Sequence, residues 1–234
     1  MGGSAASIEA LRGRALDLIG TDAARSAFDL NKESPKTRER YGMHRYGQRA
    51  LMARRLVEHG ATWVTCVLEN ATPPGVQMKQ NHCYNWDSHA VNCHIFDDTQ
   101  YKLGFLDQAM SALIEDLYSR GLNKRVLLVV TGEFGRTPRI ENSIGTQTKV
   151  MQPGRDHWPQ AQAIVVSGAC KTGVVVGSTT AKAEVPKDRP MTPNDLWATV
   201  FQHLDIDYNR ISFPDGSGRP MPMLPDGTAI PELI

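Results

Sequence analysis

The sequence predicts a layered α/β domain, and three observations support this fold class. Amphipathic helical segments alternate with short apolar segments that are rich in β-branched residues. Polar loops follow or precede these apolar segments, as they do in sheets whose sites form at the carboxyl ends of strands. No internal repeat or low-complexity linker divides the 234 residues, so we expect a single domain over 1–234. The order of helices and strands predicts several parallel strands packed against helices.

The first half of the chain predicts helices followed by one strand. Apolar residues at helical spacing indicate a helix within 5–20, a short helix within 23–30 and a basic helix within 36–59. The segment 61–69, ATWVTCVLE, is expected to form a largely buried strand because it is short and rich in β-formers. The polar stretch 70–92 is expected to be a loop.

The second half predicts buried strands between helices. Its expected elements are a helix at 98–120, a strand at 125–131, a loop at 140–160, a strand at 162–168, an edge strand at 173–177 and a helix at 192–206. Thr192 and Pro193 suit the N-cap and the first position of the last helix.

Composition excludes several classes of function. Lys and Arg number 26 against 25 Asp and Glu, a net charge of +1, so no nucleic-acid partner is expected. No apolar run reaches the roughly 18 residues that a membrane helix needs. The first 20 residues lack a basic segment followed by an apolar core, so no signal peptide is visible and the localisation stays undetermined.

The first candidate site lies in the polar loop, in the sequence NWDSHAVN at 85–92. Asp87 and His89 are two positions apart, so an irregular loop can bring both side chains to one point. A carboxylate with an imidazole suits zinc, manganese or iron. The simpler alternative is a histidine that is hydrogen-bonded to a local carboxylate without a metal.

The second candidate, TGEFGRTP at 131–138, directly follows an apolar strand. Glu133 is therefore in a typical place for a metal ligand or a general base. Arg136 offers a planar guanidinium suited to phosphate, sulfate or carboxylate. The alternative is an Arg–Glu ion pair that holds the turn together.

The third candidate, PGRDHWP at 153–159, places Asp156 beside His157 and next to Arg155. Adjacent side chains of an extended segment point in opposite directions. Either one of the two ligates and the other orients it, or a bent backbone lets both reach a metal. The alternative is a loop in which Trp158 packs inward and its neighbours face solvent.

Together the three loops predict a site for metal-assisted transfer of a charged ester. Ser88 or Thr131 could serve as the nucleophile, but the pattern distinguishes neither, so the catalytic residue stays unknown. The predicted divalent metal is zinc, manganese or calcium. The predicted metal ligands are Asp87, His89, Glu133, Asp156 and His157, and the predicted anion-binding residues are Arg136 and Arg155.

The cysteines do not predict a zinc knot. Cys83 and Cys93 lie near several histidines, but C-x-x-C pairs, which are typical of structural zinc sites, are missing. Cys66 and Cys170 have apolar neighbours and are expected to be buried.

Several segments in combination resemble the domain of unknown function 1501 (DUF1501) family. They are YGMHRYGQRALMARRLVEHGATWVTC, the Asp87–His89 loop, TGEFGRTPRI, GRDHW and DLWATVFQHLDID, and the resemblance covers about 5–233. It implies the alkaline phosphatase and sulfatase superfamily, a three-layer α/β/α fold with a mostly parallel sheet, and hydrolysis of a small-molecule or glycan phosphate or sulfate ester. Asp87, His89, Glu133 and His157 resemble that superfamily's metal ligands.

The resemblance also implies that this chain corresponds to the C-terminal half of a family member. Relatives are expected to be exported, and to begin with a signal and a Gly-Gly-x-Ser motif that has no counterpart here. We therefore expect an incomplete site with weak or no activity, and an exposed sheet edge that favours self-association. The alternative is a non-catalytic binding or structural module with a structural metal site.

Overall fold

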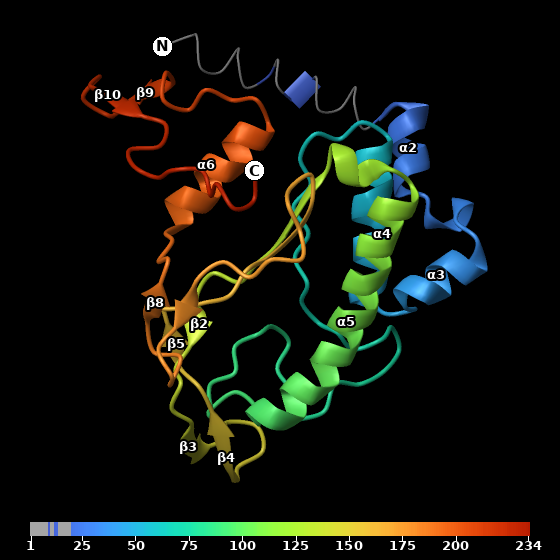
Figure 1. The fold of residues 1–234 in the computed structure, drawn as a ribbon. Coiled ribbons are helices and arrows are strands. Elements are labelled where there is room, and N and C mark those ends of the chain that lie inside the picture. The colour runs from blue at the N-terminus through green and yellow to red at the C-terminus, as the bar shows by residue number, and fades with distance from the viewer. Residues whose placement is uncertain (1–8, 10–11, 14–19) are drawn as a thin grey trace. The chain divides into compact units, whose positions relative to one another are not determined.

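The computed structural model describes residues 9, 12, 13 and 20–234, and Figure 1 traces their helices and strands. The helix expected within 5–20 lies mostly outside the described residues.

The chain separates into two compact units. The first contains the residues up to Glu115 together with Ser143–Gln152, and the second contains Asp116–Asn142 together with Pro153–Ile234. Most of the helical residues lie in the first unit, and most of the strands lie in the second.

Helices of the first unit begin at side-chain caps. The elements are α2 (Asp22–Phe28), the 3-10 turn η1 (Leu30–Lys32), α3 (Pro35–Tyr41) and α4 (Arg45–Glu58). The hydroxyl of Thr21 accepts a hydrogen bond from Ala24 N at 3.1 Å, so the helix expected within 23–30 is confirmed as α2. The helix expected within 36–59 is divided at Gly42, whose φ of +99° ends α3.

A buried ionic network connects these helices. The side chains of Arg54 and Arg55 are 1% and 6% exposed, and both pair with Glu33, which lies between η1 and α3. Glu58 pairs with Arg54 at 2.5 Å. Burial alone would raise the pKa of Glu33, but hydrogen bonds from the two guanidinium groups lower it below its ordinary value.

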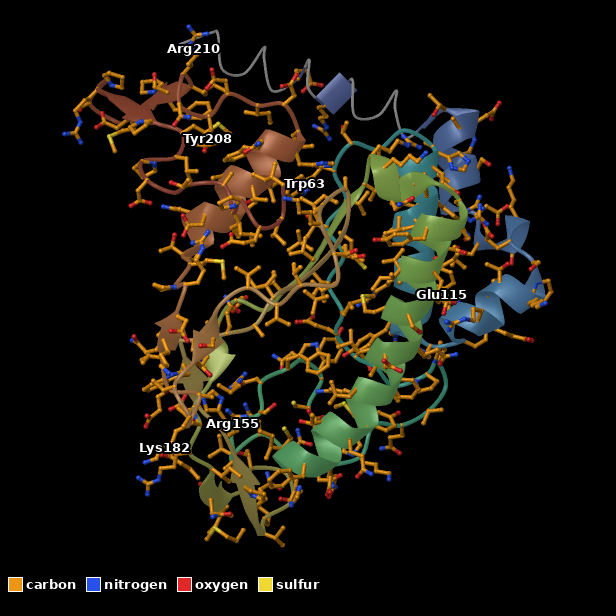
Figure 2. All side chains as sticks on the ribbon, viewed as in Figure 1. Trp63, Glu115, Arg155, Lys182, Tyr208 and Arg210 are labelled. Carbon is orange, nitrogen blue, oxygen red and sulfur yellow. The ribbon has the colours of Figure 1, made fainter. Side chains whose placement is uncertain are left out.

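Helix α5 (Ile95–Ser119) confirms the helix expected at 98–120 and starts slightly earlier. Its buried apolar face includes Ala109 and Leu113. Glu115, labelled in Figure 2, projects from α5 and pairs with Arg40 of α3 at 2.6 Å. Among the described residues, no helix combines the length and the apolar character needed to cross a membrane.

The prediction of a strand over 61–69 is wrong. This segment is extended but pairs with no described strand, and Trp63 and Val67 are 55% and 59% exposed. Arg49 of α4 donates instead to the carbonyl of Val67 at 2.7 Å. A β-rich composition forms a strand only where a neighbouring strand supplies backbone partners, and none of the described segments does so here.

The second unit contains the two strands expected in the second half, β1 (Leu127–Val130) and β6 (Val165–Gly168). They pair antiparallel, with Leu127 opposite Gly168 and Val130 opposite Val165. β1 is half-buried throughout, so it is less enclosed than expected.

The mixed α/β class is confirmed, but the expected mostly parallel sheet does not form among the described residues. A parallel pair requires a long crossover, usually a helix. The connection from β1 to β6 contains short strands and no helix, so the chain returns antiparallel.

The prediction of a loop at 140–160 is partly wrong, because short strands form within this segment. The edge strand expected at 173–177 is displaced, since pairing begins at Ser178. The strands outside β1 and β6 are β2 (Gly135–Arg136), β3 (Glu141–Ile144), β4 (Met151–Gly154), β5 (His157–Trp158), β7 (Ser178–Thr179), β8 (Pro186–Asp188), β9 (Ser212–Pro214) and β10 (Pro220–Pro222). They pair as two-stranded ribbons: β2 with β5, β3 with β4, β7 with β8 and β9 with β10.

The last helix, α6 (Pro193–His203), begins as its sequence predicts. Thr192 and Asp195 form a reciprocal capping box, in which Asp195 accepts from Thr192 N at 2.7 Å. Pro193 occupies the first turn, where its missing N–H costs no hydrogen bond.

Candidate functional site

In the first unit, Asp87 and His89 form a hydrogen-bonded pair in the polar loop. The pair joins His89 Nδ1 to Asp87 Oδ1, and Asn92 Nδ2 donates to Asp87 Oδ2 at 2.5 Å. Because Nδ1 is engaged by the carboxylate, a metal on this histidine would be ligated through Nε2. A carboxylate that orients a histidine in this way is a common arrangement at metal centres.

Buried contacts hold the loop that carries this pair. Asp98 of α5 accepts a hydrogen bond from Cys83 N at 3.0 Å, four residues before Asp87. Trp86 Nε1 donates to the carbonyl of Leu68 at 2.7 Å, and the ammonium of Lys102 lies 5.5 Å from the Trp86 ring centroid. The backbone around Asp87 is therefore positioned by groups with little solvent access.

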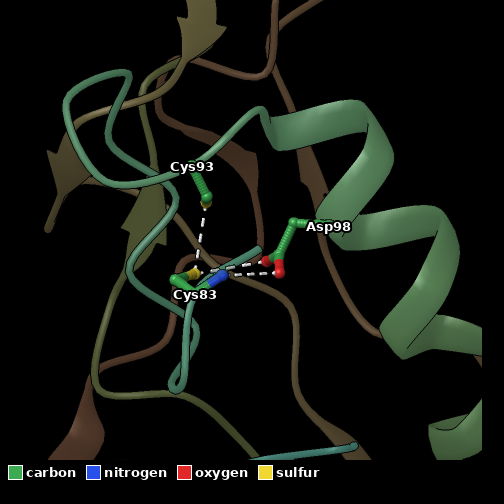
Figure 3. A group of neighbouring side chains, drawn as sticks. All are labelled: Cys83, Cys93 and Asp98. Carbon is green, nitrogen blue, oxygen red and sulfur yellow. Dashed lines mark hydrogen bonds between the residues drawn. The ribbon is translucent and has the colours of Figure 1, made fainter. Parts of the chain in front are cut away.

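A second cluster of possible ligands includes two cysteines on either side of this pair in the sequence, and Figure 3 shows its three members. The donor atoms of Cys83, Cys93 and Asp98 all lie within 4.8 Å of one another, and all three residues are buried. Cys93 Sγ lies 3.2 Å from Cys83 Sγ, and Lys102 Nζ lies 3.3 Å from Cys83 Sγ and 2.7 Å from Asp98 Oδ2.

Contacts in this cluster shift the pKa values of the two thiols in opposite directions. The hydrogen bond donated by Cys93 lowers the pKa of the Cys83 thiol, and the positive charge of Lys102 lowers it further against the effect of burial. The same hydrogen bond, together with burial, raises the pKa of the Cys93 thiol. Cys83 is therefore the sulfur on which negative charge is better stabilised.

In the second unit, the GEFGRTP and GRDHW segments meet as the β2–β5 ribbon. Gly135 lies opposite Trp158, and Arg136 lies opposite His157. A Cβ at Gly135 would lie 1.9 Å from the carbonyl oxygen of Ala161, so only glycine fits this close approach.

The two predicted anion-binding arginines brace this ribbon. Arg155 donates from Nη2 to the carbonyl of Arg136 at 3.0 Å and from Nε to the carbonyl of Thr137. Arg136 donates in return to the carbonyl of Arg155 at 3.2 Å. These contacts give both guanidinium groups a structural role, and their predicted anion binding stays a prediction.

Asp156 and His157 have different roles in the ribbon. The carboxylate of Asp156 accepts from His157 N at 2.6 Å, and the ring of His157 lies 4.3 Å from the Phe134 ring. Asp156 thus bonds to the backbone of His157, and its predicted role at a metal site stays a prediction. Glu133 is exposed in the turn after β1.

The predicted site residues form two sets. Asp87 and His89 are joined in the first unit, whereas Arg136, Arg155, Asp156 and His157 are joined in the second, with Glu133 in the turn before β2. Neither proposed nucleophile is distinguished, since Ser88 and Thr131 both donate to nearby carbonyls at 3.3 and 2.8 Å.

Sequence reasoning missed three residues. They are Asn92, Asp98 and Lys102. The sequence does carry a signal for the last two, because Asp98 and Lys102 are four apart in a helix and so lie on one face.

Comparison with known proteins places the chain in a family without assigning it an activity. No match was found among curated proteins or among solved structures. The profile of the family described as "Protein of unknown function (DUF1501)" matches residues 5–234. That match covers nearly the whole chain, which therefore belongs to the DUF1501 family.

Proposed function

We propose that this chain is a metal-dependent, hydrolase-like protein for phosphate or sulfate esters, related to the alkaline phosphatase and sulfatase superfamily. The proposal includes a correspondence to the C-terminal half of a family member. It leaves out the mostly parallel sheet of the superfamily's three-layer fold, because β1 and β6 pair antiparallel. The observation that carries it is the Asp87–His89 pair, because a carboxylate-oriented imidazole suits a divalent metal. A bound metal would supply Lewis acidity or an activated water.

The proposal assigns a role to each residue of the two sets. In the first unit, His89 ligates through Nε2, and Asp87 holds its ring while Asn92 holds Asp87. In the second unit, His157 ligates and Asp156 fixes its backbone. Glu133 is a further candidate ligand, and Arg136 and Arg155 are candidates for binding the anionic ester.

Metal content tests the proposed ligands one at a time. Elemental mass spectrometry on the purified chain, after incubation with zinc, manganese or calcium, is expected to show bound metal. His89→Ala, Asp87→Asn and His157→Ala should each reduce the amount of bound metal. His59→Ala is the control, because His59 Nδ1 contacts the carbonyl of Arg55 in its own helix and no proposed ligand.

Unchanged metal affinity in both His89→Ala and His157→Ala would contradict the assignment. Where metal binds, hydrolysis of aryl phosphate and aryl sulfate esters tests the enzymatic part. Turnover that follows metal content across the variants would support a hydrolase.

A non-catalytic module is the second candidate, and one observation favours it. Arg136 and Arg155 direct their described hydrogen bonds to backbone carbonyls. A structural metal site is closed by protein ligands, whereas a hydrolytic site keeps a position for water or substrate. Metal that binds without exchangeable water, measured by water relaxation with manganese, would favour the module.

A further inference from the structure

The two buried cysteines that flank the Asp87–His89 pair in the sequence lie within reach of each other. Their sulfur atoms are 3.2 Å apart, and Cys83 and Cys93 are 9% and 0% exposed. A disulfide bond would require the sulfurs to approach by only about 1 Å more. The other two cysteines differ: Cys66 is exposed and Cys170 is half-buried, so the expectation that both are buried is wrong.

The charged neighbours of the pair favour thiol chemistry over metal binding. Lys102 Nζ lies between possible ligand atoms, at 3.3 Å from Cys83 Sγ and 2.7 Å from Asp98 Oδ2. A divalent cation among these atoms would be repelled by the ammonium group. The same ammonium favours negative charge on Cys83 Sγ, the attacking form of a thiol, whereas Asp98 Oδ2, which accepts the thiol hydrogen bond of Cys83 at 3.3 Å, opposes it.

We propose that Cys83 and Cys93 form a reversible disulfide that closes the loop carrying Asp87 and His89. This redox site is independent of the proposed hydrolase function. It links residues 83 and 93, and the hydrogen-bonded Asp87–His89 pair lies between them in the sequence.

The co-reactant is a small-molecule disulfide of the glutathione type. Cys83, the more exposed of the two, attacks one sulfur of this disulfide, whose S–S bond breaks. The departing sulfur takes the Cys83 proton and leaves as a thiol. Cys93 then attacks Cys83 Sγ, forms the protein disulfide, and its proton leaves with the second small thiol. The protein pair loses two electrons and two protons, and the small disulfide gains both.

The sequence makes this step simple to measure. Trypsin releases residues 80–102 as one peptide that contains Cys83 and Cys93. It cleaves after Lys79 and after Lys102, and no other Lys or Arg lies between these two sites. Cys66 and Cys170 fall in separate peptides, at 56–79 and 156–171. The intact native chain is equilibrated with reduced and oxidised glutathione, and the reaction is quenched in acid. The chain is then alkylated under denaturing conditions and digested with trypsin, and the peptide masses are measured by mass spectrometry.

As the buffer becomes more oxidising, peptide 80–102 should lose two hydrogens and resist alkylation at both cysteines. Reduction should reverse both changes. Cys93→Ser should abolish the loss of two hydrogens and leave glutathione attached to Cys83. Cys66→Ser and Cys170→Ser are the matched controls and should behave as the unsubstituted chain.

Two outcomes would overturn the proposal, and both are read from the unsubstituted chain, so they do not depend on a variant that folds. One is double alkylation of peptide 80–102 across the whole redox range while Cys66 reacts. The other is stoichiometric zinc that protects Cys83 and Cys93 from both oxidation and alkylation, which would make the cluster a metal site.

Discussion

The two units of this protein hold their charged side chains in different ways. In the first unit, carboxylates lie buried against cations: Lys102 and Asp98 are 2% and 1% exposed at the side chain. In the second unit, the charged groups of Arg155, Asp156 and Asp195 bond to nearby backbone groups at or near the surface. The same residue types therefore stabilise a packed interior in one unit and shape local turns in the other.

The difference extends to the two candidate ligand sets. The Asp87–His89 loop is tied to buried groups of α5, whereas His157 is held by a two-residue ribbon. Charge substitutions near the first set should therefore reduce the stability of the whole unit, and those near the second should act locally.

The largest effect is expected for Asp98→Ala. This substitution leaves the ammonium of Lys102 buried without its carboxylate, which typically costs about 3–5 kcal/mol. The Cys83 amide also loses its acceptor. Urea unfolding followed by circular dichroism measures the change in the free energy of unfolding.

The matched control for this prediction is Asp116→Ala, also in α5. Asp116 faces Arg120 at 3.5 Å in a more exposed pair that is likewise four residues apart. Its loss should cost no more than about 1 kcal/mol. Equal effects of the two substitutions would contradict the view that burial makes the first pair important.

A smaller effect, with a pH dependence, is expected for Glu33→Gln. At neutral pH the variant loses charged hydrogen bonds to Arg54 and Arg55, which should cost about 1.5–3 kcal/mol, since Glu58 still pairs with Arg54. The pKa of Glu33 is lowered in the folded state. Its stabilisation is therefore complete above the ordinary pKa of 4.5 and is lost as the pH falls through the folded pKa.

Urea unfolding between neutral and acidic pH measures this dependence. The difference between the unsubstituted chain and Glu33→Gln should be constant near neutrality and should shrink in acid. Glu115→Gln, which removes a more exposed partner of Arg40, should show a small difference at every pH. A gap for Glu33→Gln that is independent of pH would show that the ion pairs do not carry the effect.

Local signals in the sequence located most helices correctly. Thr192, Pro193 and Asp195 specify the start of α6 by short-range hydrogen bonds that any helix can make. The prediction of a strand over 61–69 failed because strand formation depends on a distant partner, which composition does not reveal. The expectation of several parallel strands is not met by β1 and β6 for the same reason: the direction of pairing depends on whether the connection folds as a helix or as ribbons.

The candidate site was predictable in part. Spacing alone suggested that Asp87 and His89 could meet, and they do. Arg155 looked like an anion ligand by residue type, yet its guanidinium donates to two carbonyls of the facing strand region, a contact that only strand pairing creates. The Cys83–Lys102 contact joins a loop to a helix and has no pattern in the loop itself.

The smallest expected effect, from Arg155→Lys, tests the second unit. Arg155, labelled in Figure 2, bridges the carbonyls of Arg136 and Thr137 with its fork of donors, and the single ammonium of lysine lacks this geometry. Global stability should fall by less than about 1 kcal/mol. Amide exchange at Thr137, whose N–H donates to the Asp156 carbonyl at 2.9 Å, should nevertheless become clearly faster as the ribbon loosens.

Arg210→Lys, at an exposed pair with Asp207, is the control and should leave this exchange unchanged. Unchanged exchange at Thr137 in Arg155→Lys would mean that the arginine does not hold the ribbon.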